Sequence, residues 1–213
     1  MQAKSSASEQ TGSGSGRTFT ESARRTQIVQ AAIVVLADAG YAKTSFAKIA
    51  KQAGLSSTGM ISYHFSGKDD LMHEVVAEVM RVSEAFMLPR ITAAEGYSGR
   101  LRAYIESNVE LLAAHPDHLP ALTEVVTNLK GDDPHRVGFA DSLRSIMDVQ
   151  EQRMRDAQAA GEFREFDVHV MVTAMRGAID GVVLRSVAEP GLDVVACGHE
   201  LADIFDLATR RTP

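Results

Sequence analysis

Apolar side chains recur three or four residues apart along most of this chain, and no segment alternates apolar and polar residues as a strand does. This spacing places the apolar residues on one face of successive helices, so an all-α fold is predicted. The predicted helices run from Ser22 to Gly40, from Thr44 or Ser45 to Gly54, from Ser56 or Ser57 to about Phe65, from Asp69 as far as Pro89, and over 101–114, 119–129, 139–160, 168–187 and 194–208.

The first three helices have clear start and stop signals. Gly40 and Gly54 each follow a periodic run, and glycine ends helices because it adopts a left-handed conformation without a Cβ clash. Serine and threonine hydroxyls precede the two short helices, where they are favoured caps. The predicted packing residues of these helices are Ile28, Ala31, Ala32, Val35, Leu36, Phe46, Ile49, Ala50, Leu55 and Ile61.

Residues 44–65 have the form of a helix-turn-helix, in which a tight turn joins a bracing helix to a helix that enters the major groove of DNA. Ala53 and Gly54 permit the two helices to approach closely. Hydroxyls and amides can bond phosphates, and a Met60 methyl can touch a thymine methyl. The second helix has no Arg, Asn or Gln for bidentate base reading. The polar and aromatic side chains left to face DNA are Ser56, Ser57, Thr58, Ser62, Tyr63 and His64.

Over about a quarter of its length the chain resembles the TetR family of bacterial regulators. The matching residues are Ala39-Gly40-Tyr41, Thr44, Ile49-Ala50, Ala53-Gly54-Leu55-Ser56, Tyr63-His64-Phe65 and Gly67-Lys68-Asp69-Asp70-Leu71. The resemblance implies a two-fold dimer with two DNA-binding heads, phosphate contacts by Tyr63 and Lys68, and a divergent ligand-binding body. Between Ser56 and Phe65 the chain is one residue longer than the commonest family form. The complete set of expected DNA contacts adds Thr44, Ser45 and Gly59 to the residues already named.

Charge divides the chain in the same way. The net charge is -6, yet residues 17–70 hold seven basic and four acidic side chains, a net +3, which leaves -9 for the rest. A basic end on an acidic chain indicates contact with a polyanion at that end only. The predicted domains are a disordered arm at 1–16, a DNA-binding domain at 17–70 and an effector-binding and dimerisation domain at 71–213. The arm is either a plain tail or a DNA contact through Arg17.

The last two predicted helices are richer in apolar residues than one buried face requires. The resembling family forms an intersubunit four-helix bundle from its final two helices, and small residues here would let two backbones approach. The alternative is a pair of internal core helices. The predicted homodimer interface consists of Ala174, Gly177, Ala178, Gly181, Leu201, Ile204 and Phe205.

A small-molecule pocket in a helical body is mostly apolar with a few placed polar groups. Arg176 is the most suggestive candidate, because a partly buried guanidinium needs an anion. That anion is either a ligand carboxylate or Asp180, four residues along the same helix. The candidate effector residues are Tyr104, Asn108, Phe139, Arg144, Met147, Met175 and Arg176.

The functional hypothesis is a cytoplasmic repressor whose affinity for double-stranded operator DNA changes when an effector binds. The alternatives are a constitutive DNA-binding dimer without a ligand and a small helical enzyme. No nucleophile-and-base pair supports an enzyme, and the His115-Pro116-Asp117-His118 segment is explained by helix capping rather than by metal ligation. No cofactor, metal or membrane span is expected, and the lone Cys197 suits a reducing compartment.

Overall fold

The computed structural model describes residues 14–129, 134–189 and 191–211, with the side chains of 14–19, 134–137, 139 and 187 left out. Over these residues the chain forms helices joined by short turns, and the only β-type pairing is an isolated bridge between Phe163 and Arg210. The all-α prediction is confirmed. The helices are α1 (Gly14–Ala39), α2 (Phe46–Gln52), α3 (Gly59–His64), α4 (Lys68–Ala93), α5 (Gly96–Ala114), α6 (His118–Asn128), α7 (Pro134–Ala159), α8 (Val168–Ala188) and α9 (Val194–Thr209).

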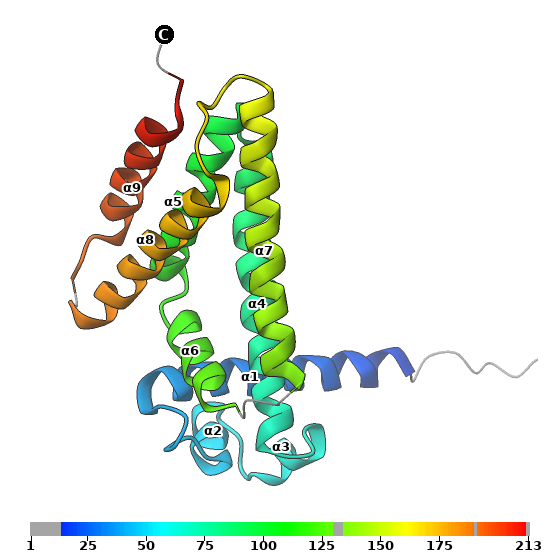
Figure 1. Ribbon diagram of the computed structural model, residues 1–213. Helices are drawn as coiled ribbons and strands as arrows, with labels where there is room; N and C mark the ends of the chain where they lie inside the picture. The colour runs from blue at the N-terminus through cyan, green and yellow to red at the C-terminus, as the bar shows by residue number, and fades with distance from the viewer. Residues whose placement is uncertain (1–13, 130–133, 190, 212–213) are drawn as a thin grey trace, which may run out of the picture.

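Helices α1 to α3 gather at one end of the molecule, and α4 rises from them into an upright body made by α5 and α7 to α9 (Figure 1). We call α1 to α3 with the start of α4 the head, and the remaining helices the body. Within the described residues, no helix combines the length and apolar character needed to cross a bilayer. The long α4 begins in the head and continues into the body, so it joins the two regions.

The head has a continuous apolar core. The predicted stripe of α1 and the predicted packing residues of α2 and α3 are confirmed, since Ile28, Leu36, Ile49 and Ile61 have no exposed surface. Ala121 and Val125 of α6 belong to the same cluster, although they lie far along the sequence. Burial of these side chains is what stabilises the two short helices, because helices of six or seven residues are unstable alone.

Two predicted helix starts are wrong. The first helix begins at Gly14 and not at Ser22, so α1 overlaps the end of the arm predicted over 1–16. Residues 1–13 lie outside the described part of the chain. Ser56 and Ser57 do not cap the third helix, because α3 begins at Gly59 with Thr58 at its N-cap and no side-chain cap hydrogen bond. Both serine side chains are instead exposed in the turn that precedes α3.

The predicted end of the fourth helix at Pro89 is also wrong, since α4 continues to Ala93 with the proline inside it. Proline removes one backbone hydrogen bond from a helix. Here Pro89 is exposed, so water can reach the carbonyl that lacks a partner. Arg90 also donates to the Phe86 carbonyl at 2.5 Å across this turn. The remaining predicted helices match the structure within a few residues, apart from the earlier starts of α5 and α7.

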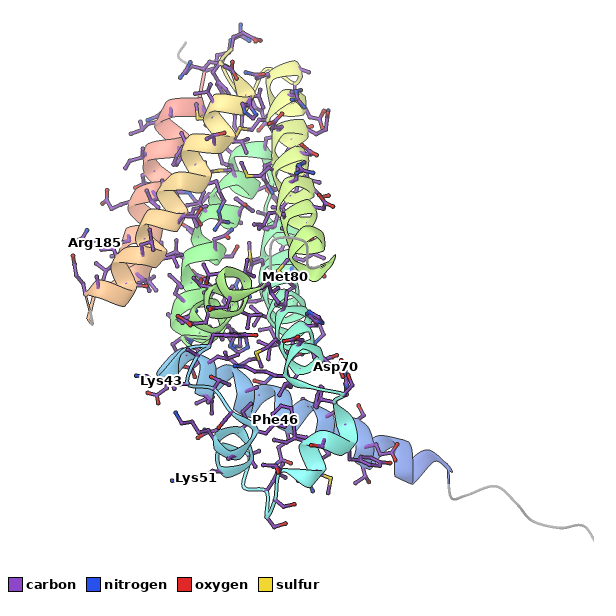
Figure 2. The ribbon with its side chains drawn as sticks, turned by 60° about the horizontal axis from the view of Figure 1, so that its bottom comes forward. Lys43, Phe46, Lys51, Asp70, Met80 and Arg185 are labelled. Carbon is purple, nitrogen blue, oxygen red and sulfur yellow. The ribbon has the colours of Figure 1, made fainter. Side chains whose placement is uncertain are left out.

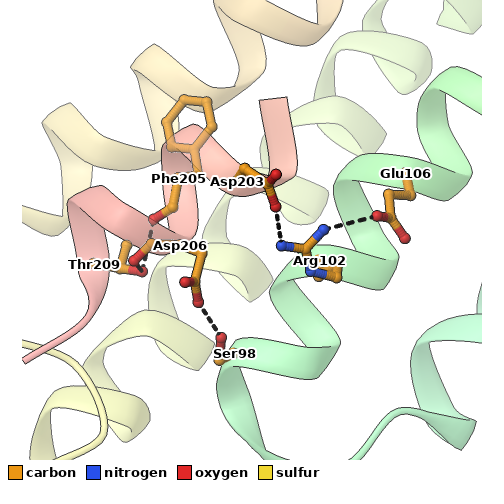
Figure 3. A network of polar contacts seen from close by, with 7 residues as sticks. All are labelled: Ser98, Arg102, Glu106, Asp203, Phe205, Asp206 and Thr209. Atoms are coloured by element: carbon orange, nitrogen blue, oxygen red, sulfur yellow. Dashed lines mark hydrogen bonds and ion pairs between the residues drawn. The ribbon is translucent and has the colours of Figure 1, made fainter. Parts of the chain in front are cut away.

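The body has its own apolar core, built from α5, α7, α8, α9 and the end of α4. Polar contacts hold α9 against α5 (Figure 3). Arg102 bridges Asp203 of α9 and Glu106 of its own helix, and the Ser98 hydroxyl donates to Asp206 at 2.6 Å. These contacts lie on the face of α9 that packs against α5, and the opposite face is left toward solvent.

Candidate nucleic-acid interface and body cavities

Helix α3 presents a polar face to solvent. Its apolar residue Ile61 and the following Phe65 are buried in the head core, whereas Tyr63 is 70% exposed. The structure thus brings most of the predicted DNA contacts onto one accessible surface of the helix-turn-helix. The exposed members are Ser56, Ser57, Thr58, Gly59, Met60 and Ser62.

Two of the predicted DNA contacts have structural roles in the turn before α2. The Thr44 side chain is buried and its hydroxyl donates to the Gly40 carbonyl at 2.8 Å. Ser45 caps α2 by accepting from the Lys48 amide at 3.4 Å. Lysines on this end of the head, among them Lys43 and Lys51, extend outward from it (Figure 2). They add positive charge to the surface of the head.

Helix α1 holds the helix-turn-helix in place through backbone carbonyls. The Gln27 amide donates to the Ala53 carbonyl at 2.7 Å, next to the turn at Gly54, whose φ of +65° favours glycine. Arg25 donates to the His64 carbonyl at 2.9 Å, pairs with Glu74 at 2.5 Å and stacks over the Phe65 ring. Sequence reasoning missed Arg25, because its partners lie 39 and 49 residues away and no local pattern marks them.

The predicted phosphate contacts at the end of α3 differ in their surroundings. The Tyr63 hydroxyl donates to Glu21 at 3.3 Å across solvent-exposed space, and its ring meets His64 edge-on at 5.0 Å. The Lys68 amine instead donates to the Tyr41 carbonyl at 2.7 Å and lies over the Tyr41 ring. Burial lowers the pKa of Lys68, opposed by the nearby Asp69 carboxylate. Tyr63 is thus free to turn toward a duplex, and Lys68 also anchors a loop.

Helix α4 begins with a carboxylate cap. The Ser66 amide donates to Asp70 at 2.9 Å, and this hydrogen bond lowers the pKa of the Asp70 carboxyl. A carboxylate in the first turn also interacts favourably with the helix dipole, as the sequence indicates. The cap keeps α4 rigid where it leaves the helix-turn-helix.

A single carboxylate of α6 contacts the loop that leads into the helix-turn-helix. Glu124 accepts from the Tyr41 amide at 2.8 Å, and its side chain also lies against Gly40. The Tyr41 carbonyl on the other side of this residue accepts from Lys68. Residue 41 is therefore bonded to both α6 and α4, which makes this loop a physical connection between the body helices and the head. The 83-residue separation hides the Glu124 contact from sequence analysis.

The body contains two adjoining cavities between α4 and α7. The upper cavity, of about 350 Å³, lies among the ends of α4 and α7 and the start of α5. The lower groove, of about 730 Å³, runs between α4 and α7 and is lined mainly by apolar side chains. Ile91, Gln150 and Arg153 line both. The two spaces therefore meet around these three residues.

The predicted effector residues are scattered in the structure. Tyr104 lines the lower groove, Met175 is buried in the body core, and Met147 packs partly buried against that core. The Arg144 side chain is 71% exposed and pairs with Asp141. The side chain of Phe139 lies outside the described residues. Only Tyr104 of this group is placed against a cavity.

Arg176 finds its anion within its own helix. It pairs with Asp180, donates to the Asn108 side-chain oxygen at 3.5 Å and lies near Tyr104. Burial opposes the charged form of Arg176, and these partners more than offset it, so its pKa is raised. Of the two possibilities in the sequence, the structure shows the Asp180 pair. Asn108 also donates to the Tyr104 backbone carbonyl at 2.7 Å, one turn back along α5.

The outward face of α8 and α9 is unusually apolar. Val170, Leu184, Ile204 and Leu207 are each more than half exposed. Ala174, Gly177 and Gly181 lie exposed on α8, and no atom lies within 4 Å of a Cβ built on either glycine. Phe205, by contrast, packs inside the body core, and Ala178 and Leu201 pack against that core. The interface predicted from sequence thus divides into an outward set and an inward set.

The described residues contain no group of three or more His, Cys, Asp or Glu side chains arranged to hold a metal ion. The rings of His115 and His118 lie 4.8 Å apart. Burial and the neighbouring His115 lower the pKa of His118.

Comparisons with known proteins agree with the geometry of the head. The sequence model of the family described as bacterial regulatory proteins, tetR family, matches residues 28–75. The chain is 34% identical over 88 residues to the HTH-type transcriptional regulator BetI 1 of Chromohalobacter salexigens, an alignment that covers 41% of this chain and 43% of that relative. It is 26% identical to the fatty acid metabolism regulator protein of Bacillus subtilis, over 84% of this chain and 92% of the relative.

A solved structure shares the whole fold. AibR, in complex with isovaleryl coenzyme A and operator DNA, aligns with a TM-score of 0.70 at 21% identity, over 86% of this chain and 96% of the AibR chain. The matched residues thus include the entire helix-turn-helix, and the likeness in fold extends through the body.

Proposed function

Because the chain belongs to the TetR family of bacterial regulatory proteins, we propose that it is a transcriptional repressor that binds operator DNA and responds to a small-molecule effector. The observation that carries this proposal is the exposed face of α3. Its polar side chains face solvent while Ile61 and Phe65 fasten it to the head core. Such a helix can enter the major groove without any rearrangement of the core. As a DNA-binding regulator it acts in the bacterial cytoplasm.

The absence of Arg, Asn and Gln on α3 implies a particular mode of recognition. Hydroxyls of Ser57 and Thr58 and the Tyr63 phenol reach phosphates, while the Met60 methyl contacts bases. Sequence preference then depends on DNA shape and bound water as much as on direct base contacts. Lys48 and Lys51 supply charge at the backbone, so binding weakens as salt rises.

We propose that two copies pair through the outward face of α8 and α9. An exposed apolar face of this extent is typical of a protein interface, and small residues at Ala174, Gly177 and Gly181 permit close approach of two helices. Ile204 and Leu207 extend the face onto α9. We leave Phe205 out of this interface because it fills the protomer core.

The effector half of the proposal rests on the two cavities beside α4. A ligand that favours one position of α4 changes the position of the head attached to it. A neighbour of the same fold was solved with both an acyl thioester and operator DNA, which supports a ligand-responsive repressor over the constitutive alternative. The relatives are transcriptional regulators, which favours a regulator over the enzyme alternative.

A genomic selection tests the proposal. Purified protein is mixed with fragmented DNA of the source genome at moderate ionic strength, and retained fragments are sequenced. We expect a small set of fragments that share a two-fold site. Retention of no fragment above random duplex would overturn DNA-binding specificity.

Charge variants then locate the contact. Lys51→Ala should weaken binding to the selected site and lower the slope of log affinity against log salt by about 1. Arg185→Ala, at the side of the body and away from the head (Figure 2), removes the same charge and should leave binding unchanged. Tyr63→Ala should weaken binding without lowering the melting temperature, because its ring is exposed.

A further inference from the structure

The two cavities beside α4 adjoin each other. Ile91, Gln150 and Arg153 line both, so these residues lie where the upper cavity and the groove come together. The groove extends along α4 from Ile91 to Ala77, which is about 21 Å at the rise of an α-helix. Its walls include Met80, Met87, Leu88, Ile146 and Val149. Flexible methionines in such a wall adapt to an apolar chain.

A polar side chain lines both cavities where they adjoin. Gln150 is 6% exposed, and no hydrogen bond joins its side-chain amide to another described residue. An amide that faces a cavity can hydrogen-bond to a molecule that enters it. An oxygen or an N–H group of a ligand could therefore bond to Gln150 directly.

Charge along this space is one-sided. Arg153 lines both compartments and has no ion-pair partner among the described residues, and Arg100 lines the upper cavity. Among the described residues, no acidic side chain lines the upper cavity. The acid of the groove is Glu84, on the α4 wall, while Arg81 in the same wall is already paired with Glu78. An anion is therefore favoured at the Arg153 end and disfavoured beside Glu84.

We infer that this space binds a single long-chain acyl amphiphile, with its alkyl chain in the groove and its acyl oxygen and negative charge at Gln150 and Arg153. The inference rests on the proposed ligand response and names its ligand class. Gln150 donates to the acyl oxygen, and Arg153 with Arg100 interacts with the carboxylate or phosphate charge. Both a free fatty acid and its thioester carry these features. Because the groove separates α4 from α7, the chain would press directly on the helix that carries the head.

Calorimetric titration of the full-length protein tests this inference. The probes are hexadecanoate, hexadecanoyl coenzyme A and uncharged 1-hexadecanol, each below its micelle concentration. We expect at least one of the two anionic probes to bind at least tenfold more tightly than the alcohol. The anionic probe that binds more tightly identifies the free acid or the thioester as the physiological form. Equal affinity for the alcohol, or no binding of either anion, would overturn the inference.

Matched variants locate the anion. Arg153→Gln should weaken the anionic probe at least tenfold and leave the alcohol unchanged, whereas Arg144→Gln, on the same helix but outside both cavities, should change neither. Gln150→Leu removes the amide at similar volume and should weaken binding of the acyl probes. Undiminished anion affinity in Arg153→Gln contradicts the assignment.

Operator retention is measured in the same samples. If the protein retains its selected DNA and neither anion binds, the ligand assignment fails and the DNA-binding proposal stands. If an anion binds and no DNA is preferred, the DNA-binding proposal fails and the ligand assignment stands.

Discussion

The head and the body of this protein use polar side chains in opposite ways. In the head, Arg25, Gln27 and Lys68 reach across to backbone carbonyls of other elements, so α3 is held from several directions. In the body, several arginines pair within their own helix, as Arg176 does with Asp180 and Arg185 with Glu189, although Arg90 and Arg102 also reach carboxylates of other helices. Contacts inside one helix do not restrain its position against its neighbours. The head is thus built to keep one geometry and the body to permit several.

Packing shows the same difference. The head core closes completely around Ile28, Ile49, Ile61 and Leu71, none of which has exposed surface. The body leaves an apolar groove between α4 and α7. An exception within the body is the α5 and α9 pair, which Arg102 and Ser98 join across helices. The part of the body that moves is therefore expected to be the α4 and α7 side, away from the proposed dimer face.

The largest effect is expected from matching deletions in the two regions. Phe65→Ala removes a ring that is 2% exposed and stacked under Arg25, so we expect a loss of about 3–5 kcal/mol of stability. Leu88→Ala in the groove wall, where the side chain is 45% exposed, should change stability by less than about 0.5 kcal/mol. Chemical denaturation measures both. Comparable losses would show that the groove is as well packed as the head.

Two glycines test the backbone in the same comparison. Gly54→Ala places a Cβ at φ +65°, with no neighbouring atom within 4 Å, so the cost is conformational and about 1–2 kcal/mol. Gly177→Ala lies in a regular helix with open space around it, so it should stabilise the isolated protomer by about 0.5–1 kcal/mol. The same alanine should weaken the proposed dimer, as measured by sedimentation. Unchanged dimer affinity would place the interface elsewhere.

The link between the regions is tested at Glu124. Glu124→Gln weakens the hydrogen bond from the Tyr41 amide, and we expect a stability loss of about 1 kcal/mol. Hydrogen exchange at Tyr41 should accelerate, and ligand should alter operator affinity less than in the wild type. Glu106→Gln, which breaks a contact within α5, is the control and should leave the ligand response intact. A full response in Glu124→Gln would show that coupling takes another route.

The smallest effect is a pH dependence at the α6 joint. Burial first, then His115, lowers the pKa of His118, while Glu78 and Asp117 oppose the shift. The unfolded chain therefore binds a proton at higher pH than the folded one, so stability from this group is present above the ordinary histidine pKa and is lost as pH falls through and below it. His118→Gln should reduce the fall in melting temperature between pH 7.5 and 5.5.

The exposed His169 provides the opposite case. Its hydrogen bond to Glu151 raises its pKa, so its contribution is present below the ordinary histidine pKa and is lost as pH rises through the folded value. His169→Gln should therefore lower stability slightly at pH 5.5 and leave it unchanged at pH 7.5. For His118, the contrary outcome is a fall in melting temperature between pH 7.5 and 5.5 that is as large in His118→Gln as in the wild type. Other groups would then cause the pH dependence.

Much of the head could be predicted from the sequence because its signals are local. The α1 stripe, the glycines at 40 and 54 and the burial of Ile49 and Ile61 follow from spacing within one or two turns. The start of α3 at Gly59 could not be predicted, since three successive hydroxyl residues offer equivalent caps. The dimer face was predicted only in part, because Phe205 and Leu207 are both apolar and only the rotation of α9 separates them.

The amino-acid order alone determined that this chain is helical, where most helices lie and which segment forms the helix-turn-helix, because each depends on residues a few positions apart. Tertiary structure decided that Arg25 holds the end of α3, that Glu124 holds the loop at Tyr41, that Arg176 pairs with Asp180, and that Gln150 and Arg153 line one cavity. Those relations depend on how each helix turns about its own axis when it packs. That rotation is set by the whole core at once and by no single stretch of sequence.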